Sequence, residues 1–255
     1  MSAATAAILA AADALLEVNA FEDYGPNGLQ VPGLEQVERI YTGVSASAEL
    51  FQRAAAHGPG LLLVHHGLFW GSGFTTIDAT LKHRLKALFD AQLALAAYHL
   101  PLDAHPRLGN NALLAQALDA DGELEPFASH RGRTIGFLAT LPGRGLPLAK
   151  LIERIAALTS QPPLVQGAGD EQITRLAIVS GSGGDYVFEA AASRADALLT
   201  GETSERIMAN ARELSVHVIA AGHYATETFG IKALGEYLAD AFRLPHVFLD
   251  VPNPV

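Results

Sequence analysis

The chain has 255 residues, a length that fits one or two domains. Hydrophobic residues make up 49% of it and charged residues 17%, which excludes a disordered protein and leaves enough apolar material for a buried core. The net charge of −10 disfavours a broad basic surface for nucleic acid, although it leaves room for a local basic groove. The absence of cysteine excludes disulfides, thiolate nucleophiles, iron–sulfur clusters and cysteine-rich zinc sites. Any metal must therefore be held by nitrogen and oxygen atoms.

Close to the N-terminus, an apolar stretch runs from Ala3 to Leu16. Asp13 and Glu17 fall in or beside this stretch and no basic residue precedes it, so we expect an amphipathic first helix rather than a signal peptide. No run reaches the roughly 18–20 apolar residues that a membrane span needs. We therefore expect a cytoplasmic protein that has no membrane partner.

Short β-branched or aliphatic runs then alternate with longer stretches rich in alanine and leucine. The expected strands are Arg39–Val44, Leu61–Val64, Ala94–Tyr98, Thr134–Thr140, Arg175–Val179, Ala197–Thr200, His217–Ala220 and His246–Leu249. The expected helices are Ala4–Val18, Ala46–Ala56, Thr80–Phe89, Asn111–Leu118, Pro147–Leu158, Tyr186–Ser193, Ser204–Leu214 and Glu227–Ala241. This alternation predicts an α/β architecture, and wholly apolar strands such as Leu61–Val64 are typical of a sheet covered on both faces.

The alternation is interrupted near residues 119–132. Asp119 to Glu123 is acidic and turn-prone, Ser129 to Arg133 is polar, and the α/β pattern then restarts. We expect two α/β lobes, residues 1–126 and 127–255, with the last strand free to return to the first lobe.

Three of the expected strands run into histidines. His65 and His66 follow one strand, His99 follows the next, and His223 follows a strand much later in the chain. In open α/β sheets, ligands bind at the carboxyl ends of the strands. These histidines therefore converge on one crevice if their strands share a sheet edge or face one another.

Imidazole and carboxylate groups form the ligand set of zinc, iron, manganese, nickel and related ions. The adjacent histidines can serve two metals, or one metal and a contact to its ligands. His223 and Glu227 share one face if a helix begins at or before His223. Asp103, four residues after His99, and Glu227 are the natural bridges between two cations.

Most single histidines at strand ends are hydrogen-bonded structural residues. We expect that role for His57, His83, His105, His130, His217 and His246. Three histidine-bearing strand ends in a chain with only 10 histidines nevertheless favour a metal site.

Two further segments are weaker candidates. The turn from Ser180 to Gly184 lies between an expected strand and an expected helix, so its amides could cradle a phosphate, but a tight structural turn explains it equally well. Its spacing matches neither the dinucleotide fingerprint nor the Walker loop. Glu202 follows another strand and could face the same crevice.

Several segments, in order along nearly the whole chain, resemble the NIF-three-like family, dinuclear-metal proteins known as GTP cyclohydrolase 1 type 2-like. These segments are Asp23–Val31, Thr42–Ser47, Val64–Trp70, His99–Pro106, Leu108–Asn111, Thr200–Glu202, Gly222–Glu227 and Asp250–Pro254. The length is similar to that of the family's short bacterial branch. Many relatives have proline where this chain has Gly67, and Trp-Asp where it has Gly25-Pro26, which weakens any transfer of substrate contacts.

The resemblance implies two three-layer α/β lobes with a site for two divalent metal ions between them. The family's metal ligands match His65, His66, Asp103, His223 and Glu227, the same residues that the strand ends select. The resemblance also implies a ring-shaped homohexamer whose metal sites face an internal cavity.

Our leading functional hypothesis is a two-metal hydrolase. A metal-bridging water would attack a purine nucleotide such as GTP, a phosphoester or an amide. We expect His99 to transfer protons or to contact a metal ligand, with Glu202 as a weaker candidate for this role.

The alternative is a non-enzymatic, ring-forming metal-binding module or scaffold, linked to DNA-repair or transcription partners. Bridged sites without cysteine favour catalysis over this alternative, because structural zinc sites are usually closed and rich in thiolates. A ring that clamps DNA is a third hypothesis, and the net charge of −10 weighs against it.

Overall fold

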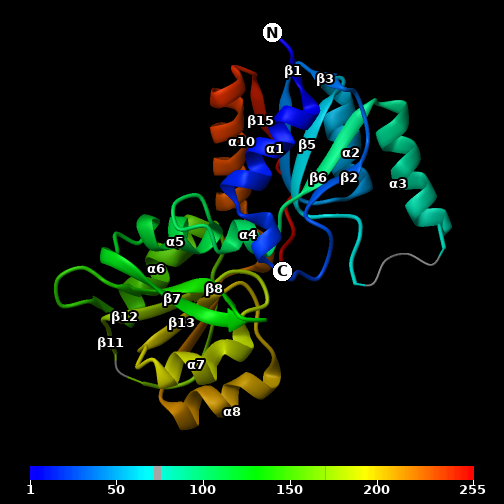
Figure 1. The fold of residues 1–255 in the computed structure, drawn as a ribbon. Helices are drawn as coiled ribbons and strands as arrows, with labels where there is room; N and C mark the ends of the chain where they lie inside the picture. The colour runs from blue at the N-terminus through cyan, green and yellow to red at the C-terminus, as the bar shows by residue number, and fades with distance from the viewer. Residues whose placement is uncertain (72–75, 170) are drawn as a thin grey trace. The chain divides into compact units, whose positions relative to one another are not determined.

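The computed structural model describes residues 1–71, 76–169 and 171–255. This part of the chain forms two compact units, which are described separately (Figure 1). Unit 1 contains Met1–Leu102 and Ile231–Val251, and unit 2 contains Asp103–Gly230 and Pro252–Val255.

The main sheet of unit 1 is mostly parallel. Its strands, in spatial order, are β15 (His246–Phe248), β4 (Ile40–Ser45), β5 (Gly60–His66), β6 (Leu93–Ala97) and β2 (Gly28–Val31). All run parallel except β2, which is antiparallel to β6. Val64 pairs with Gly43 on one side and with Ala97 on the other, so β4, β5 and β6 end at the same edge.

Helices cover both faces of this sheet. They are α1 (Thr5–Leu15), α2 (Ala48–Ala56), α3 (Ala79–Asp90) and α10 (Thr228–Phe242), which starts just before the unit boundary. Helices α1 and α10 lie on one side and α2 and α3 on the other (Figure 1). The side chains of Ser47 and Asp78 cap α2 and α3 by accepting hydrogen bonds from backbone N–H groups in the first turn. Strand β5 is buried on both faces, as its uninterrupted apolar run predicts.

Unit 2 is built on a mixed sheet. Its strands, in spatial order, are β10 (Leu164–Gln166), β14 (His217–Ala220), β13 (Ala197–Thr200), β12 (Arg175–Val179), β8 (Arg133–Thr140) and β7 (Asp121–His130). The parallel strands β12, β13 and β14 end together, because Thr200 pairs with both Val179 and Ala220. Their carboxyl ends are therefore neighbours along one edge.

The helices of unit 2 also form two layers around the sheet. They are α5 (Asn110–Ala117), α6 (Leu148–Thr159), α7 (Val187–Ala192) and α8 (Glu205–Leu214). Helices α5 and α6 lie on one face, where Leu114, Leu151 and Ile155 join a core with Ile178 and Leu199, and α7 and α8 lie on the other (Figure 1).

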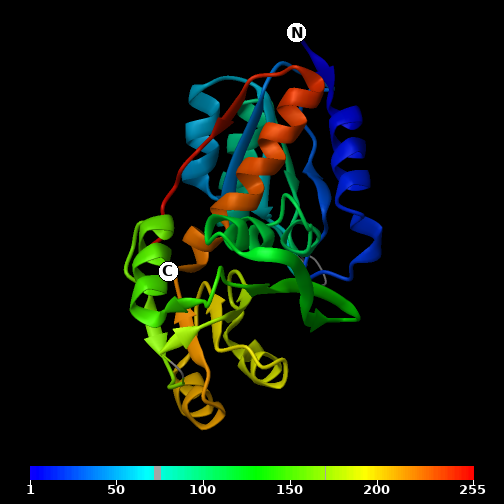
Figure 2. The same ribbon diagram turned by 90° about the vertical axis from the view of Figure 1, so that its left-hand side faces the viewer.

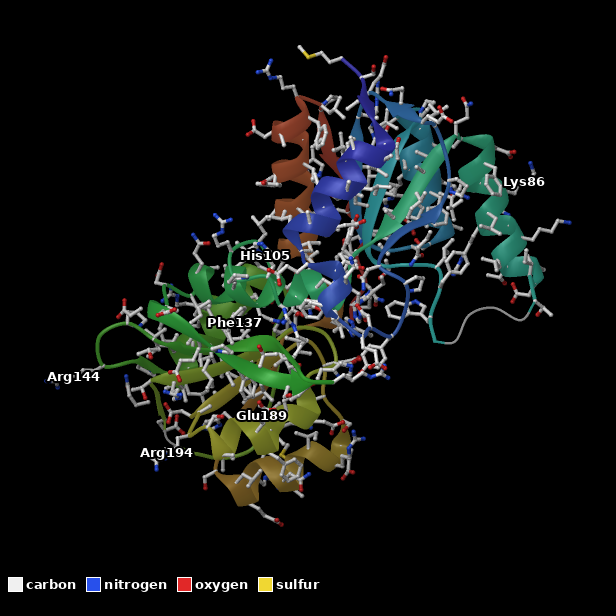
Figure 3. The ribbon with its side chains drawn as sticks, viewed as in Figure 1. Lys86, His105, Phe137, Arg144, Glu189 and Arg194 are labelled. Atoms are coloured by element: carbon white, nitrogen blue, oxygen red, sulfur yellow. The ribbon has the colours of Figure 1, made fainter. Side chains whose placement is uncertain are left out.

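Several short elements complete the described part of the chain. They are β1 (Ala3–Ala4), β3 (Gln36–Val37), α4 (Leu100–Asp103), β9 (Leu146–Pro147), β11 (Gln172–Ile173), α9 (His223–Thr226) and the 3-10 turns Val18–Ala20 and Gly184–Tyr186. The turn that carries Arg144 is exposed, whereas Phe137 of β8 is buried (Figure 3). None of the helices in the described residues is both long and apolar enough to cross a membrane.

The boundary between the units differs from the one that the sequence suggests. The first division falls after Leu102 rather than after residue 126. Residues 231–251 return to unit 1, where β15 pairs with β4, as the sequence allowed for the last strand (Figure 2). The acidic stretch that we interpreted as a boundary is instead the start of β7, a strand of unit 2 paired with β8. The first half of β7 is exposed, so its residues are mostly polar. We interpreted this polar stretch as a turn for that reason.

Candidate metal centre

In unit 1, His65, His66 and His99 gather at the carboxyl edge of the sheet. His65 and His66 are the last residues of β5, and His99 follows the neighbouring β6. Each offers one potential ligand atom, and these atoms lie within 4.8 Å of one another. His65 is fully buried, while Trp70 is 42% exposed and its ring lies 5.7 Å from that of His66. The structure thus brings the three histidines of unit 1 together, as the strand ends predicted, while metal binding by them stays a prediction.

Neighbouring polar groups define how these imidazoles are oriented. His65 Nδ1 lies 2.9 Å from the carbonyl oxygen of Tyr98, and His99 Nδ1 lies 2.7 Å from Asp23 Oδ1. Both partners are acceptors, so each Nδ1 carries the hydrogen and the neutral ring has its lone pair on Nε2. An imidazole held in this way by a second group presents its other nitrogen to a metal.

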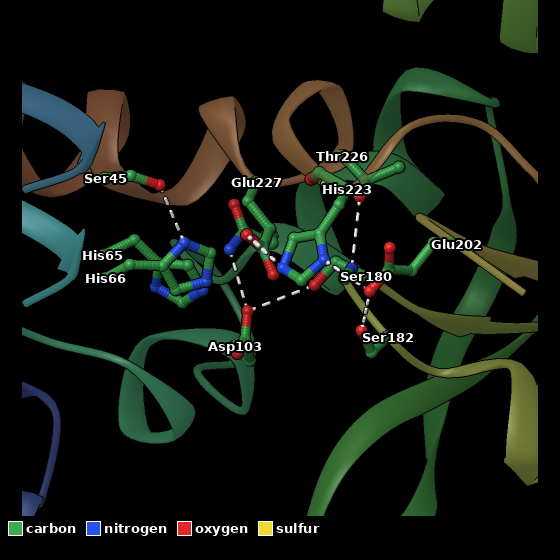
Figure 4. A network of polar contacts seen from close by, with 12 residues as sticks. Ser45, His65, His66, Asp103, Ser180, Ser182, Glu202, His223, Thr226 and Glu227 are labelled. Carbon is green, nitrogen blue, oxygen red and sulfur yellow. Dashed lines mark hydrogen bonds and ion pairs between the residues drawn. The ribbon is translucent and has the colours of Figure 1, made fainter. Parts of the chain in front are cut away.

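His66 is held by the side chain of Ser45. Its Nδ1 lies 3.0 Å from Ser45 Oγ, a hydroxyl that can donate or accept (Figure 4). Strands β4 and β5 pair Ser45 with His66 directly, so the sheet register sets this contact.

In unit 2, α9 brings His223 and Glu227 together. The helix begins at His223, and the i,i+4 spacing places His223 Nε2 3.2 Å from Glu227 Oε2. On its other side, His223 Nδ1 lies 3.1 Å from Glu202 Oε1 (Figure 4). The sequence spacing had predicted that His223 and Glu227 share one face.

The charges around His223 dominate its protonation. Burial by itself would lower the pKa of His223, but the Glu227 and Glu202 carboxylates outweigh burial and raise it to about 9. Glu202 has a lowered pKa, chiefly because Ser182 Oγ donates a hydrogen bond to it. In the absence of metal, His223 is therefore an imidazolium between two carboxylates, and a cation that binds Nε2 must displace this proton.

Asp103 is buried in unit 2 by a network of side chains. Its exposed fraction is 5%, and its Oδ1 accepts hydrogen bonds from Asn110 Nδ2 at 2.8 Å and from Ser180 Oγ at 3.1 Å (Figure 4). Asn110 is itself fixed, since its Oδ1 accepts from the backbone N–H of Gly230. The network therefore holds the Asp103 carboxylate in one orientation.

Asn111 connects this network to the sheet of unit 2. It is fully buried, it donates from Nδ2 to the carbonyl of Ile135, and its Oδ1 accepts from the N–H of Ser180. Sequence reasoning did not connect Asn110, Asn111 or Ser180 to Asp103. The signals in the sequence were the pair of asparagines at the start of a mostly apolar helix, within the Leu108–Asn111 segment, and the turn that begins at Ser180.

Gly181 leaves the space that the carboxylate of Glu227, a predicted metal ligand, occupies. Its φ of +61° is in the left-handed region, and a Cβ built on it would overlap Glu227 Oε1 and lie 3.1 Å from His223 Nε2. The preceding residue, Ser180, contacts Asp103. One turn of unit 2 therefore adjoins all three predicted ligands of this unit.

Three of the five amides in the same turn, which we considered as a phosphate cradle, have partners inside the protein. The N–H groups of Ser180, Gly181 and Gly183 donate to the side-chain oxygens of Asn111, Thr226 and Thr200. These three amides are used inside unit 2, which favours the structural interpretation of the turn, and phosphate binding by the turn stays an untested prediction.

Two of the histidines that we expected to be structural, His105 and His246, form hydrogen bonds within the protein. His105 Nδ1 accepts hydrogen bonds from the N–H groups of Arg107 and Leu108, and His246 Nε2 lies 2.7 Å from Thr42 Oγ1. Neither belongs to a group of potential metal ligands among the described residues.

The candidate donor atoms are imidazole nitrogens in unit 1 and an imidazole nitrogen with carboxylate oxygens in unit 2, a set that fits zinc, iron, manganese or nickel better than magnesium or calcium. The model of the Duf34/NIF3 (NGG1p interacting factor 3) family matches residues 3–254. The chain belongs to the Duf34/NIF3 family.

Curated relatives and solved structures match this chain over most or all of their length. A relative from Deinococcus radiodurans, named GTP cyclohydrolase 1 type 2 homolog, is 44% identical over 238 residues, which cover 93% of this chain and 89% of the relative. The solved structure of protein ybgI, of unknown function, has a TM-score of 0.92 at 38% identity, covering 99% of this chain and 100% of that one. TTHA1606 from Thermus thermophilus has a TM-score of 0.90 at 37% identity, with the same coverage. The family and the α/β fold expected from the sequence are confirmed.

Proposed function

We propose that the protein is a hydrolase that depends on two divalent metal ions. The ligands would be His65 and His66 from unit 1 and Asp103, His223 and Glu227 from unit 2. A pair of divalent cations supplies a water of lowered pKa and polarises the bond under attack.

The observation that carries this proposal is the environment of Glu227. This carboxylate is 2% exposed, packs against a glycine that leaves room for it, and lies 3.2 Å from the nitrogen of His223. Asp103, at 5% exposure, is a second buried carboxylate at the same turn, Ser180–Gly181, and burying two carboxylates is costly unless cations offset the charge. Metal ions would provide that charge and take the place of the proton on His223.

The remaining residues hold these ligands in place. The carbonyl of Tyr98 keeps the Nδ1 hydrogen on His65, and Glu202 accepts from His223 Nδ1. Asn110 and Ser180 orient Asp103. Such outer contacts are typically worth about 10–100-fold in metal affinity or activity.

The name of the relatives directs the choice of substrate. They are named as homologues of GTP cyclohydrolase 1 type 2, which makes GTP the first compound to test, together with a phosphoester and an amide. A family can contain several activities on one fold, so the reaction must be measured for this chain.

The test compares metal-free and metal-reloaded protein with GTP, p-nitrophenyl phosphate and a peptide as substrates. We expect turnover of one of them that chelation removes and added zinc, iron, manganese or nickel restores. Glu227→Gln should lower both metal affinity and turnover. Each should fall by at least roughly 10–100-fold, the loss that is typical when a group contacting a metal ligand is removed. Glu205→Gln, at an exposed position of the same unit, is the matched control and should keep both.

Two results would count against the proposal. Unchanged turnover in the metal-free protein would remove the metals from the reaction. Full metal occupancy without turnover of any tested substrate would favour the alternative of a metal-binding module.

A further inference from the structure

Outside the predicted ligand set, unit 1 contains a close carboxylate–imidazole pair. Asp23 Oδ1 lies 2.7 Å from His99 Nδ1, and the side chain of Asp23 is only 2% exposed, compared with 18% for His99. Asp23 is 76 positions from His99 in the sequence and lies in the loop before β2. The pair therefore depends on the tertiary fold of the unit.

Both oxygens of Asp23 are used by hydrogen-bond donors. Oδ1 accepts from the N–H of Tyr24 and from His99 Nδ1, and Oδ2 accepts from Asn27 Nδ2 and from the N–H of Leu100, each at 2.9 Å. Burial by itself would raise the pKa of Asp23, but the bonds from His99 and Asn27 outweigh burial and lower it. A carboxylate with only donors around it is ionised and acts purely as an acceptor.

This arrangement determines which nitrogen of His99 is available. An ionised Asp23 can only accept, so Nδ1 carries a hydrogen and Nε2 holds the lone pair of the neutral ring. The His99 ring is packed 5.0 Å from that of His65 and 5.6 Å from that of His66, and Trp70 covers it at 5.1 Å in a T-shaped contact. The lone pair on Nε2 therefore lies in the same cluster as the predicted ligands of unit 1.

We propose that Asp23 is a positioning residue that fixes His99 as the Nδ1–H tautomer, so that His99 Nε2 accepts the proton of the attacking water. This inference rests on the proposed hydrolase function. As the water oxygen forms its bond to the substrate, one water proton moves to Nε2. The same proton passes to the leaving group as the scissile bond breaks, which returns His99 to its neutral form. Asp23 stays ionised throughout.

A purely structural role of Asp23 makes a different prediction. If Asp23 only anchored its loop, any change that loosens the loop should have the same effects. Asn27 provides this comparison, because it bridges Asp23 Oδ2 and the N–H of His99 without contacting the imidazole ring. Asn27→Ala should loosen the loop and leave the His99 tautomer unchanged.

The first readout is the tautomer of His99 in metal-free protein, measured from ring ¹⁵N chemical shifts and assigned with His99→Asn. Wild type should show hydrogen on Nδ1. In Asp23→Asn, the amide oxygen stays with the two donors from Asn27 and Leu100, so the amide NH₂ meets His99 Nδ1 and moves the ring hydrogen to Nε2. Asp13→Asn is the matched control: Asp13 is a carboxylate of the same unit that accepts from Tyr98 Oη and not from His99, so wild-type shifts are expected.

The second readout is zinc content and turnover. Asp23→Asn should bind as much zinc as wild type, because Asp23 contacts none of the predicted ligands, while turnover of the substrate found in the screen falls by about 10²–10⁴-fold. Asp13→Asn should retain both zinc and turnover. Melting temperatures show which variants are folded.

The outcomes separate this inference from the proposed function. Hydrogen on Nε2 in wild type, or an unchanged tautomer in Asp23→Asn, would overturn the role of Asp23 whatever the protein catalyses. A large zinc-induced shift of His99 Nε2 itself would make His99 a ligand instead of a proton acceptor. If the tautomers behave as expected but no substrate depends on metal, the proposed function fails and the positioning by Asp23 stands.

Discussion

At Gly181, the backbone of unit 2 lies close to two candidate metal ligands, His223 and Glu227. A side chain at this position would collide with Glu227 and crowd His223. Its positive φ also disfavours other residue types, but that strain occurs equally at Gly143, where a Cβ would meet nothing within 4 Å. The two glycines separate the effect of backbone strain from the effect of steric overlap with the site.

We therefore predict different results for Gly181→Ala and Gly143→Ala. Both should lose roughly 1 kcal/mol of unfolding free energy from the strained backbone. Only Gly181→Ala should also weaken zinc binding, by about 10-fold or more, because Glu227 must move. Calorimetric titration with zinc measures this difference, and equal zinc affinity in the two variants would show that the turn does not shape the site.

His246 leads to a prediction about pH. Burial lowers its pKa in the folded chain, while Thr42 holds its Nε2 and Glu236 opposes part of the shift. In the unfolded chain, the His246 ring becomes protonated near the ordinary histidine pKa of about 6.5, whereas in the folded chain it becomes protonated only at lower pH. In that interval the unfolded state binds more protons, so the unfolding free energy contributed by His246 falls as the pH drops below about 6.5.

Urea unfolding of metal-free protein at pH 7.5 and 5.5 measures this effect. Wild type should lose more stability between these values than His246→Gln does. A folded-state titration of the His246 ring by NMR at or above pH 6.5 would contradict the prediction.

Among the elements of unit 2, the start of α5 carries two buried asparagines that form hydrogen bonds to several other segments. Asn110 and Asn111 are both fully buried, and their side chains connect Asp103, Ser180 and the backbone of β8. A buried polar group that loses its partner costs more than the average hydrogen bond contributes. The same contacts therefore orient Asp103 and stabilise the unit.

Asn111→Ala should lower the unfolding free energy by roughly 2–4 kcal/mol, because the Ser180 N–H and the Ile135 carbonyl lose their partners inside the core. Gln116→Ala on the same helix replaces an exposed side chain and should change it by less than about 0.5 kcal/mol. Chemical denaturation of both variants provides the comparison. Equal effects would mean that these buried hydrogen bonds contribute little.

Elements with a strong apolar pattern could be predicted from the sequence. Strands β12, β13 and β14 have the expected bounds, and α10 begins and ends one residue after the expected helix Glu227–Ala241. The turn α9, which begins at His223, meets the condition under which His223 and Glu227 were expected to share a face. Strand β7 was missed because its exposed half is polar. Asp23 was missed for another reason: its importance comes from a contact 76 residues away, and no local pattern reports such a contact.

At the scale of the whole molecule, each unit carries its own set of candidate metal ligands at the carboxyl edge of its own sheet. Unit 1 supplies imidazoles, and unit 2 supplies His223 with two buried carboxylates. The return of the last strand to unit 1 was left open by the sequence, and the pairing of β15 with β4 agrees with it. The division after Leu102 was not read from the sequence, because the polar start of β7 looked like a boundary.

We also predict that the protein is a symmetric homohexamer, as its resemblance to the family implies. Light scattering should give a mass of about six times the 26.8 kDa of one chain. A monomer at micromolar concentration would contradict this prediction without affecting the ligand assignment.

The central claim is that His65, His66, Asp103, His223 and Glu227 hold two divalent ions. Anomalous diffraction from crystals of zinc-loaded protein, recorded on both sides of the zinc absorption edge, tests it most directly because it locates the ions. We expect two anomalous peaks per chain, each within coordination distance, about 2.0–2.2 Å, of imidazole nitrogens or carboxylate oxygens from this set. Peaks that lie only at other residues, or no ordered zinc at all in protein saturated with the metal, would contradict the account.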